Sequence, residues 1–404
     1  MLWIGQSFSQ FAEQAGSVVL PLSAVLYLHV DAGRLGILRA VYQVPLLLFS
    51  LFAGAWVDRR STRKVMMMAD GCRALALAGM AIASLLGKLD ISTLLGVAFV
   101  IGTLSVFFDV AYQAGVVRLV ERDLLARATS ALEGTRSSAQ TVGPAIGGVL
   151  VSLFRAAAGA GLCAVFFAIS FVSIRSMRRP EPISNRSSHR PRFGQQIREG
   201  LRFVLAEPLL RALALVSAEF QFSFAALMTV YLLFLPRDLH VSGATVGLAL
   251  AATGPGAVLG ALLAPRLPKH IGYGAVLVGA PAIAEGVLLC VPALHGATAA
   301  TVAALLAVNF VFGLCCQIVD VTAVAVRQAV TADEMQGRAS ATIMFIGMGL
   351  TPLGSLLGGY LAQQWGLRTA LLAATIGALL SPVLIAISPL SRLGRTLPTR
   401  GESS

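Results

Sequence analysis

Charged side chains are scarce in this sequence. Asp, Glu, Lys and Arg make up 12% of its 404 residues, whereas 56% of the residues are hydrophobic and the mean hydropathy is +0.80. Because soluble domains contain about a quarter charged residues, this chain has too few charges to cover a water-exposed surface. The composition also excludes intrinsic disorder, a collagen-like fibre and a disulfide-rich scaffold. A multi-pass membrane protein remains.

Residues typical of catalytic and metal sites are also few. The five histidines are scattered without the spacing of metal ligands, and the five cysteines form no Cys-x-x-Cys pair. The phosphate-binding pattern G-x-x-x-x-G-K-S/T does not occur. We therefore expect a protein that is not an enzyme, holds neither metal nor cofactor, and does not hydrolyse ATP directly.

Long apolar segments are abundant. A helix needs about 20 mostly apolar residues to cross the hydrocarbon core of a membrane, and twelve segments reach this length. They cover residues 2–28, 35–57, 65–87, 91–117, 128–152, 156–177, 209–235, 242–265, 271–292, 298–326, 339–363 and 367–388. The sequence therefore predicts an all-α polytopic membrane protein with twelve transmembrane helices.

The basic residues indicate how the chain is oriented. Lys and Arg number 31 against 19 Asp and Glu, which gives a net charge of +12. Of these 31 residues, 23 lie in alternate connections and the tail, namely 57–65, 117–128, 177–209 with the adjoining Arg175 and Arg211, 265–271, 326–339 and 389–404. By the positive-inside rule this side is the cytoplasm, so we expect both termini there. The basic excess then reflects topology, and we expect no nucleic-acid partner.

One long polar segment, 178–208, separates six of the spans from the other six. Its first part, RRPEPISNRSSHRPR, has the composition of a solvated linker. Its second part places four apolar residues on one helical stripe, namely Phe193, Ile197, Leu201 and Val204. This stripe predicts a short amphipathic helix on the inner leaflet, with a plain tether as the alternative. The predicted parts are an N-terminal half (1–177), this linker, a C-terminal half (209–388) and a cytoplasmic tail (389–404).

The two halves contain an internal repeat. At an offset of 206 residues the matched pairs are Glu13 with Glu219, Ser17 with Ser223, and Gly54 with Gly260. At an offset of 211 they are Asp109 with Asp320, and Gly147-Gly148 with Gly358-Gly359. Parallel six-helix repeats of this kind occur in transporters.

The segment GAWVDRRSTRK resembles a loop of the major facilitator superfamily. The family pattern between helices two and three is G-x-x-x-D-R-x-x-R-K in outline, and the matching residues are Gly54, Asp58, Arg59, Arg63 and Lys64. The resemblance extends over essentially the whole chain. It implies two pseudo-symmetric six-helix halves and transport by alternating access, in which this loop is a gate that locks the cytoplasmic ends of the halves. The repeat-related segment of the C-terminal half keeps Gly260 but has no acid, and it contains Pro265.

A glycine-rich segment resembles the motif of drug-exporting antiporters within that superfamily. Its matching residues are Gly134, Gly143, Pro144, Gly147 and Gly148, whereas Ala139 departs from the pattern. The segments IREGLRFVLAEPLLR and ADGCRA resemble the macrolide-efflux and enterobactin-exporter branch. The resemblance implies proton-coupled export of a hydrophobic or amphipathic small molecule (a drug, antibiotic, siderophore or secondary metabolite) through a bacterial cytoplasmic membrane.

Four acids in the spans are candidates for proton coupling. They are Glu13, Glu219, Asp109 and Asp320. A charge at bilayer depth is costly, so it usually faces a cavity or a partner. In the superfamily, helices one, four, seven and ten line the central cavity, and these acids fall on those helices. The alternative is a structural, hydrogen-bonded acid near a helix end, which weighs about equally for Asp109 and Asp320.

Asp70 and Arg73 are three residues apart and can pair on one helix face. We interpret them as an ion pair that braces the gate loop near Asp58, and Arg39 as a similar brace. Glu285 has no evident partner in the sequence and stays unassigned.

Three functions are compatible with these features of the sequence. The first is a proton-coupled exporter whose partners are a small molecule, protons and membrane lipid, and which acts as a monomer. The second is a flippase of the same fold for lysophospholipid or another lipid-like substrate. The third is a non-transporting receptor or scaffold, against which the repeated intramembrane acids argue.

Overall fold

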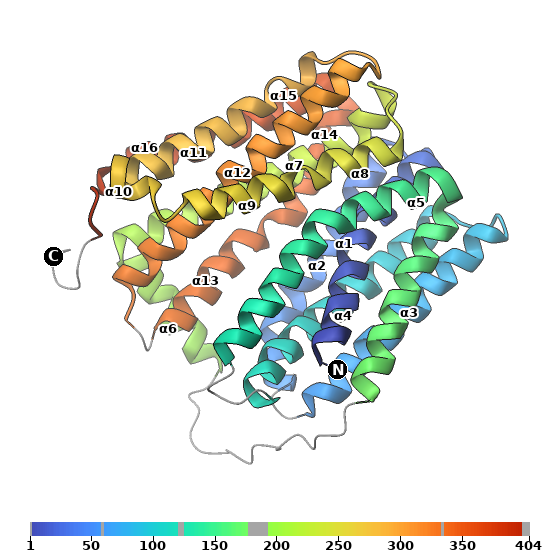
Figure 1. Cartoon of the computed structure of the whole chain (residues 1–404), viewed down its shortest axis with the longest axis horizontal. Coiled ribbons are helices and arrows are strands. Elements are labelled where there is room, and N and C mark those ends of the chain that lie inside the picture. Colours follow the sequence, from blue (N-terminus) through green and yellow to red (C-terminus); the bar gives the residue numbers. More distant parts are fainter. Residues whose placement is uncertain (1, 58–59, 120–124, 177–192, 333–334, 398–404) are drawn as a thin grey trace. The chain divides into compact units, whose positions relative to one another are not determined.

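A computed structural model describes residues 2–57, 60–119, 125–176, 193–332 and 335–397. Within these ranges the chain is helical and contains no β-strand (Figure 1). It forms two compact units, the first of Met1–Ser187 with Leu235–Ala251 and the second of Ser188–Phe234 with Ala252–Ser404.

The first unit consists of long helices. They are α1 (Leu2–Leu26), α2 (Ala32–Val57), α3 (Thr62–Leu85), α4 (Ile91–Leu119) and α5 (Leu125–Arg175), together with α8 (Gly243–Ala251). Part of its core lies between α3 and α4, where Met66, Ala69 and Phe108 are buried against each other and against Ile174 of α5.

The second unit has more and shorter elements. They are α6 (Phe193–Ala206), α7 (Pro208–Arg237, whose last three residues group with the first unit), α9 (Thr253–Leu263), α10 (Leu267–Ile271), α11 (Tyr273–Leu288), η2 (Val291–Ala293), α12 (Ala299–Val330), α13 (Gln336–Gly349), α14 (Thr351–Trp365), α15 (Leu367–Ala378), α16 (Leu380–Ile387) and η3 (Pro389–Arg392).

The twelve predicted spans all fall on these helices. Eleven segments of the described residues are long and apolar enough to cross a membrane, and α1 is the span missing from that set. Polar residues at positions such as Gln6, Gln10 and Glu13 give α1 a less apolar composition. Three predicted spans are helix pairs that break at Ala252, Leu350 and Leu379. Each break comes two or three residues before a proline, whose missing N–H interrupts the helical hydrogen bonds.

Helix α5 contains two predicted spans, 128–152 and 156–177, without an intervening loop. It doubles back instead: its two limbs run in opposite directions in Figure 1. A Cβ atom at Gly159 would lie 2.9 Å from Val151 Cγ2, whereas eight residues of straight helix span about 12 Å. The predicted separation into two helices is thus a bend within one continuous helix.

The predicted amphipathic helix is α6, and part of its apolar face is covered by protein. Val204 is fully buried against Leu210 and Ala214 of α7 and Ile343 of α13. Leu201 of the same helix is 39% exposed. Contact of α6 with the inner leaflet stays a prediction.

Candidate functional site

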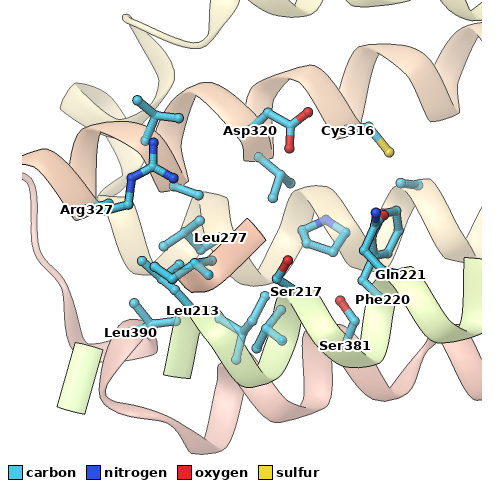
Figure 2. Close-up of a pocket in the computed structure, with 18 of the residues that line it drawn as sticks. Leu213, Ser217, Phe220, Gln221, Leu277, Cys316, Asp320, Arg327, Ser381 and Leu390 are labelled. Atoms are coloured by element: carbon cyan, nitrogen blue, oxygen red, sulfur yellow. The ribbon is translucent and has the colours of Figure 1, made fainter. Parts of the chain in front are cut away.

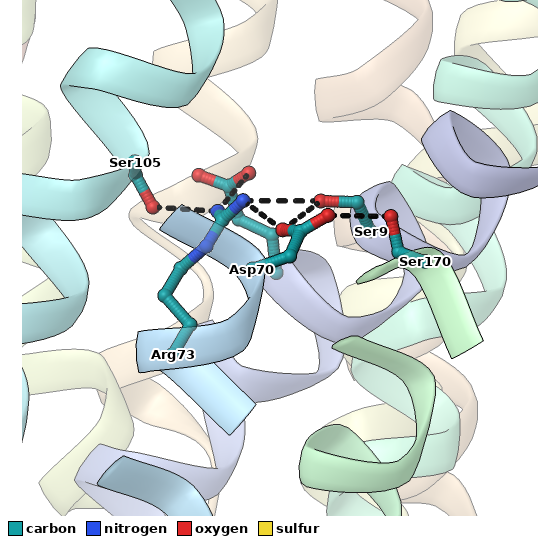
Figure 3. A network of polar contacts seen from close by, with 6 residues as sticks. Ser9, Asp70, Arg73, Ser105 and Ser170 are labelled. Carbon is teal, nitrogen blue, oxygen red and sulfur yellow. Dashed lines mark hydrogen bonds and ion pairs between the residues drawn. The ribbon is translucent and has the colours of Figure 1, made fainter. Parts of the chain in front are cut away.

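A buried ion pair lies at the centre of the first unit. Asp70 and Arg73 of α3 are both inaccessible to solvent and bind each other directly. Arg73 Nη2 also donates to Ser9 Oγ of α1 at 3.2 Å, and Nη1 donates to Ser105 Oγ of α4 at 3.1 Å. Figure 3 shows these contacts, with Ser170 of α5 on the far side of Asp70. The pair thus connects four helices.

Both members of the pair are stabilised by further contacts. Asp70 accepts hydrogen bonds from the hydroxyl groups of Ser9, at 3.1 Å, and Ser170. The Arg73 guanidinium lies 4.5 Å from the ring centre of Phe108 and 4.4 Å from that of Phe167. Aromatic faces attract cations, and the attraction is stronger where water is excluded. The predicted Asp70–Arg73 pair is therefore present, whereas its contact with the gate involves Asp58, which lies outside the described residues.

Glu13 belongs to the same charge cluster. Its Oε2 lies 3.8 Å from Arg73 Nη1, and its side chain is 18% exposed. Asp109 of α4 is close enough to interact electrostatically with both residues. Two residues predicted for proton coupling and two predicted for an ion-pair brace thus form a single cluster, which we call the Arg73 cluster (Glu13, Asp70, Arg73 and Asp109).

Glu219 of α7, the repeat counterpart of Glu13, has different surroundings. Ser223 donates a hydrogen bond to Glu219 Oε1 at 2.8 Å, while Oε2 is buried without a partner among the described residues. In the first unit the matching Ser17 donates instead to the Gln14 carbonyl at 2.7 Å. The repeat therefore preserves residue types but not contacts.

The second unit contains a cavity of about 430 Å³ between α7, α11, α12, α13 and α16. Asp320, predicted for proton coupling, lines it together with Arg327, Ser217 and Ser381 (Figure 2). Glu285 lines it too and is only 1% exposed. The sequence signal for Glu285 was a single acid in an apolar segment, which gave no indication of its neighbours.

The described part of the gate segment contacts the end of α5. Arg63 Nε donates to the Ile174 carbonyl at 3.1 Å, and the same guanidinium donates to the Arg175 carbonyl. These carbonyls belong to the last helical turn, which lacks internal donors and favours a cation. The Lys64 backbone N–H bonds to the N-cap Ser61 at 3.4 Å. Asp58 and Arg59 lie outside the described residues.

Arg39 does not form the predicted ion pair within the described part of the chain. It lines a smaller cavity of about 90 Å³ beside Tyr42 and Gln43. Its Nε is buried and no described residue accepts a hydrogen bond from it. The prediction rested on the tendency of buried charges to pair. The titratable side chain beside Arg39 on the same helix is Tyr42, which is a phenol and not a carboxylate.

The glycines of the antiporter-like motif allow close helix packing. A Cβ at Gly143 would lie 2.6 Å from Gln14 Cβ of α1, and one at Gly147 would lie 2.7 Å from the Ala15 carbonyl oxygen. A Cβ at Gly148 would lie 2.4 Å from the Gly243 carbonyl oxygen at the start of α8. Real Cβ contacts this short do not occur, so these positions require glycine. Gly134 has open space around it.

Comparison with known families identifies the chain. The model of the transmembrane secretion effector family, part of the major facilitator superfamily, matches residues 1–397. The chain belongs to this family. The predicted fold of a major facilitator permease is therefore confirmed, and the family consists of transporters rather than enzymes.

Relatives and solved structures agree with this assignment. The permease is 28% identical to the multidrug efflux pump Tap of Mycolicibacterium fortuitum, over 86% of this chain and 85% of the relative. It is 23% identical to macrolide efflux protein A of Streptococcus pyogenes, over 91% and 90%. The crystal structure of the nucleoside transporter NupG has a TM-score of 0.74 at 12% identity, over 95% of this chain and 97% of that chain, which shows a shared fold.

Family membership makes this permease a multi-pass membrane protein with a small-molecule substrate. Each unit of the permease contains one of the groups of charged side chains described above. The Arg73 cluster contains three acids around a fixed arginine in the first unit, and the cavity of the second unit contains Glu285, Asp320 and Arg327.

Proposed function

We propose that this permease exports drug-like, hydrophobic or amphipathic small molecules in exchange for protons. The observation that carries the proposal is the similarity, over most of the chain, to proteins named as a multidrug efflux pump and a macrolide efflux protein. We also propose a bacterial cytoplasmic membrane as its location, with both termini in the cytoplasm, because most basic residues fall in alternate connections and the tail, and such segments usually face the cytoplasm.

We assign proton coupling in the first unit to Glu13. Asp70 is fully buried and accepts two serine hydrogen bonds, whereas the Glu13 side chain is partly exposed and lies 3.8 Å from Arg73. A proton can therefore bind to or leave Glu13 while the Asp70–Arg73 pair stays intact. This separation gives the cluster one exchangeable carboxylate and one structural carboxylate.

Glu219 is our second coupling residue, because it has the repeat-related position and a carboxylate oxygen without a hydrogen bond among the described residues. We keep Asp109 and Asp320 as further candidates. Asp109 interacts electrostatically with Glu13, and Asp320 lines the cavity of the second unit.

Proteoliposomes with an acidic lumen and a radiolabelled macrolide outside test this assignment. Permease molecules inserted with their cytoplasmic face outward would carry protons out of the lumen. In exchange, they would accumulate the macrolide in the lumen above its external concentration. We expect Glu13→Gln and Glu219→Gln to abolish this uphill accumulation while retaining downhill movement, because an amide cannot bind and release the coupled proton. The matched control is Glu199→Gln, at a half-exposed residue that pairs with Arg338.

Accumulation by both variants at the wild-type level would contradict the coupling assignment. Accumulation by the wild type without a pH gradient would contradict proton exchange. If lysophospholipid moved between leaflets while the macrolide did not, the flippase alternative would replace the proposed export function.

A further inference from the structure

The repeat places α11 of the second unit at the position of α3 in the first. At the offset of 211 residues, Thr62 at the start of α3 corresponds to Tyr273 at the start of α11. The same offset places Pro281 at the position of Asp70 and Ala284 at that of Arg73. The next residue, Glu285, introduces an acid. The second unit therefore lacks the buried pair of the first unit and has an acid one residue after the position of Arg73.

Glu285 has no hydrogen bond at either carboxylate oxygen within the described part of the chain, and both oxygens are buried. Ser381 is a polar neighbour of the carboxylate, and Glu219 and Cys316 are close enough to interact with it electrostatically. A buried carboxylate without a cationic partner costs several kcal/mol. Glu285 also lines the cavity of the second unit, so a ligand in that cavity can supply a hydrogen-bond donor to its carboxylate.

The cavity beside Glu285 has the size and lining of a small-molecule site. Its volume of about 430 Å³ is within the range of about 300–1,000 Å³ for ligand pockets. Its walls are mostly apolar and include Phe220, Leu277 and Met344. Figure 2 shows Arg327 at one end of the cavity and Phe220 at the other, with Asp320 between them. The end near Phe220 is thus the one farther from a competing positive charge.

We propose that this cavity binds an amphipathic organic ammonium ion and that Glu285 is its counter-charge. The ammonium N–H groups would donate to the carboxylate oxygens that have no donor, and the apolar part would contact the walls near Phe220. The two acids against one arginine in the lining favour a cation over an anion. This inference deepens the proposed export function by naming a substrate class, and it rests on that function for the transport step alone.

A matched series of three ligands tests the binding of the ammonium group. Full-length permease in lipid nanodiscs is titrated with 4-phenylbutylamine, its N,N,N-trimethyl derivative and 4-phenylbutanol, with empty nanodiscs as the partition control. We expect the ammonium ion to bind most tightly, the quaternary cation less tightly, and the alcohol most weakly. Glu285→Gln should weaken binding of the ammonium ion by at least about tenfold, because the charge pair is lost while the shape is kept.

Two further variants separate charge from folding. Arg327→Gln removes a positive charge from the lining and should tighten ammonium binding, whereas Glu199→Gln outside the cavity should leave it unchanged. Glu285→Asp keeps the charge and should bind more tightly than Glu285→Gln. If the substitutions acted only through folding, Glu285→Gln and Arg327→Gln would not change the affinity for the ammonium ion in opposite directions.

Absence of ammonium binding to the wild type, or equal affinity in Glu285→Gln, would overturn this inference, and so would equal binding of the alcohol. Macrolide accumulation in proteoliposomes would in those cases leave the proposed export function standing. Conversely, Glu285-dependent binding without any accumulation would support the site and refute export.

Discussion

Arg73 is the residue on which most polar contacts of the first unit converge. It contacts Ser9 and Glu13 of α1, Asp70 of its own helix and Ser105 of α4. Removing one member of a buried ion pair costs about 3–5 kcal/mol, because the other charge is left unpaired, whereas removing both costs less. The stability of the unit therefore depends more on the balance of these charges than on the presence of either one.

Arg73→Met should lower the free energy of unfolding by about 3–5 kcal/mol, measured by denaturant titration of the detergent-purified protein. The double variant Asp70→Asn/Arg73→Met should recover part of that loss, because the fully buried Asp70 carboxylate is then no longer left unpaired. The exposed pair Asp31–Arg34, at 3.5 Å, provides the control, and Arg34→Met should cost no more than about 1 kcal/mol. Equal losses in the single and double variants would contradict the role of charge balance.

Local spacing predicted the Asp70–Arg73 pair, because residues three apart share a helix face. It did not predict the approach of Glu13 to Arg73, which depends on how α1 packs near α3. Glu285 was visible as an acid, but its cavity is formed by five helices that are distant in sequence. For Arg39, the general tendency of charges to pair predicted an ion pair, whereas no described residue accepts a hydrogen bond from its Nε.

Helix α5 uses its glycines on two faces. Gly143 and Gly147 lie against α1, while Gly148 lies against Gly243 and Gly247 of α8. In the second unit Gly358 of α14 lies against the Ala226 carbonyl oxygen of α7, with 2.4 Å between that oxygen and an added Cβ. Gly147 and Gly358, which correspond in the repeat, thus both support close helix packing.

Gly148→Ala should destabilise the permease by about 1–3 kcal/mol, because the added methyl group overlaps backbone atoms of α8. Gly134→Ala, on the same helix and in the same motif, should be neutral because nothing lies within 4 Å of its Cβ position. Thermal unfolding followed by size-exclusion chromatography measures both. Loss of stability in Gly134→Ala of the same size would show that helix packing does not explain the motif.

Hydropathy was sufficient to predict the existence and approximate bounds of the helices, because twenty apolar residues have few other stable arrangements in a membrane. The breaks at Ala252, Leu350 and Leu379 were not predicted, although a proline follows each of them closely. The sequence predicted two separate spans where the structure has the single bent helix α5. Hydropathy cannot distinguish a loop between two helices from a helix that folds back near residue 155.

At the scale of the whole molecule, residues that match in the sequence repeat can have different neighbours in the two units. Gly54 and Gly260 occupy equivalent positions, yet they differ in their surroundings. A Cβ at Gly260 would lie 2.3 Å from the Leu314 carbonyl oxygen of α12, whereas nothing lies within 4 Å of the position at Gly54. Packing explains the glycine of the second copy. Packing does not explain Gly54 in the first copy, which is the copy that contains the gate motif.

Gly260→Ala should therefore lower thermal stability, whereas Gly54→Ala should leave it unchanged and slow transport. The slower transport is expected if Gly54 is part of the gate, because the added methyl group would then meet other helices when the gate closes. Denaturation curves and initial rates of macrolide accumulation, taken on the same preparations, separate the two effects. Wild-type transport by Gly54→Ala would contradict the gate assignment.

The grouping of Leu235–Ala251 with the first unit has a consequence for biosynthesis. Arg237 donates to the Val30 carbonyl at 2.5 Å, and α8 packs against Gly148. The ribosome makes about 5–20 residues per second, so several seconds separate the end of the first long segment from the arrival of α8. During that time five helices are already synthesised while the glycine face around Gly148 has no partner. The final packing of this face of α5 therefore has to wait until α8 has been synthesised.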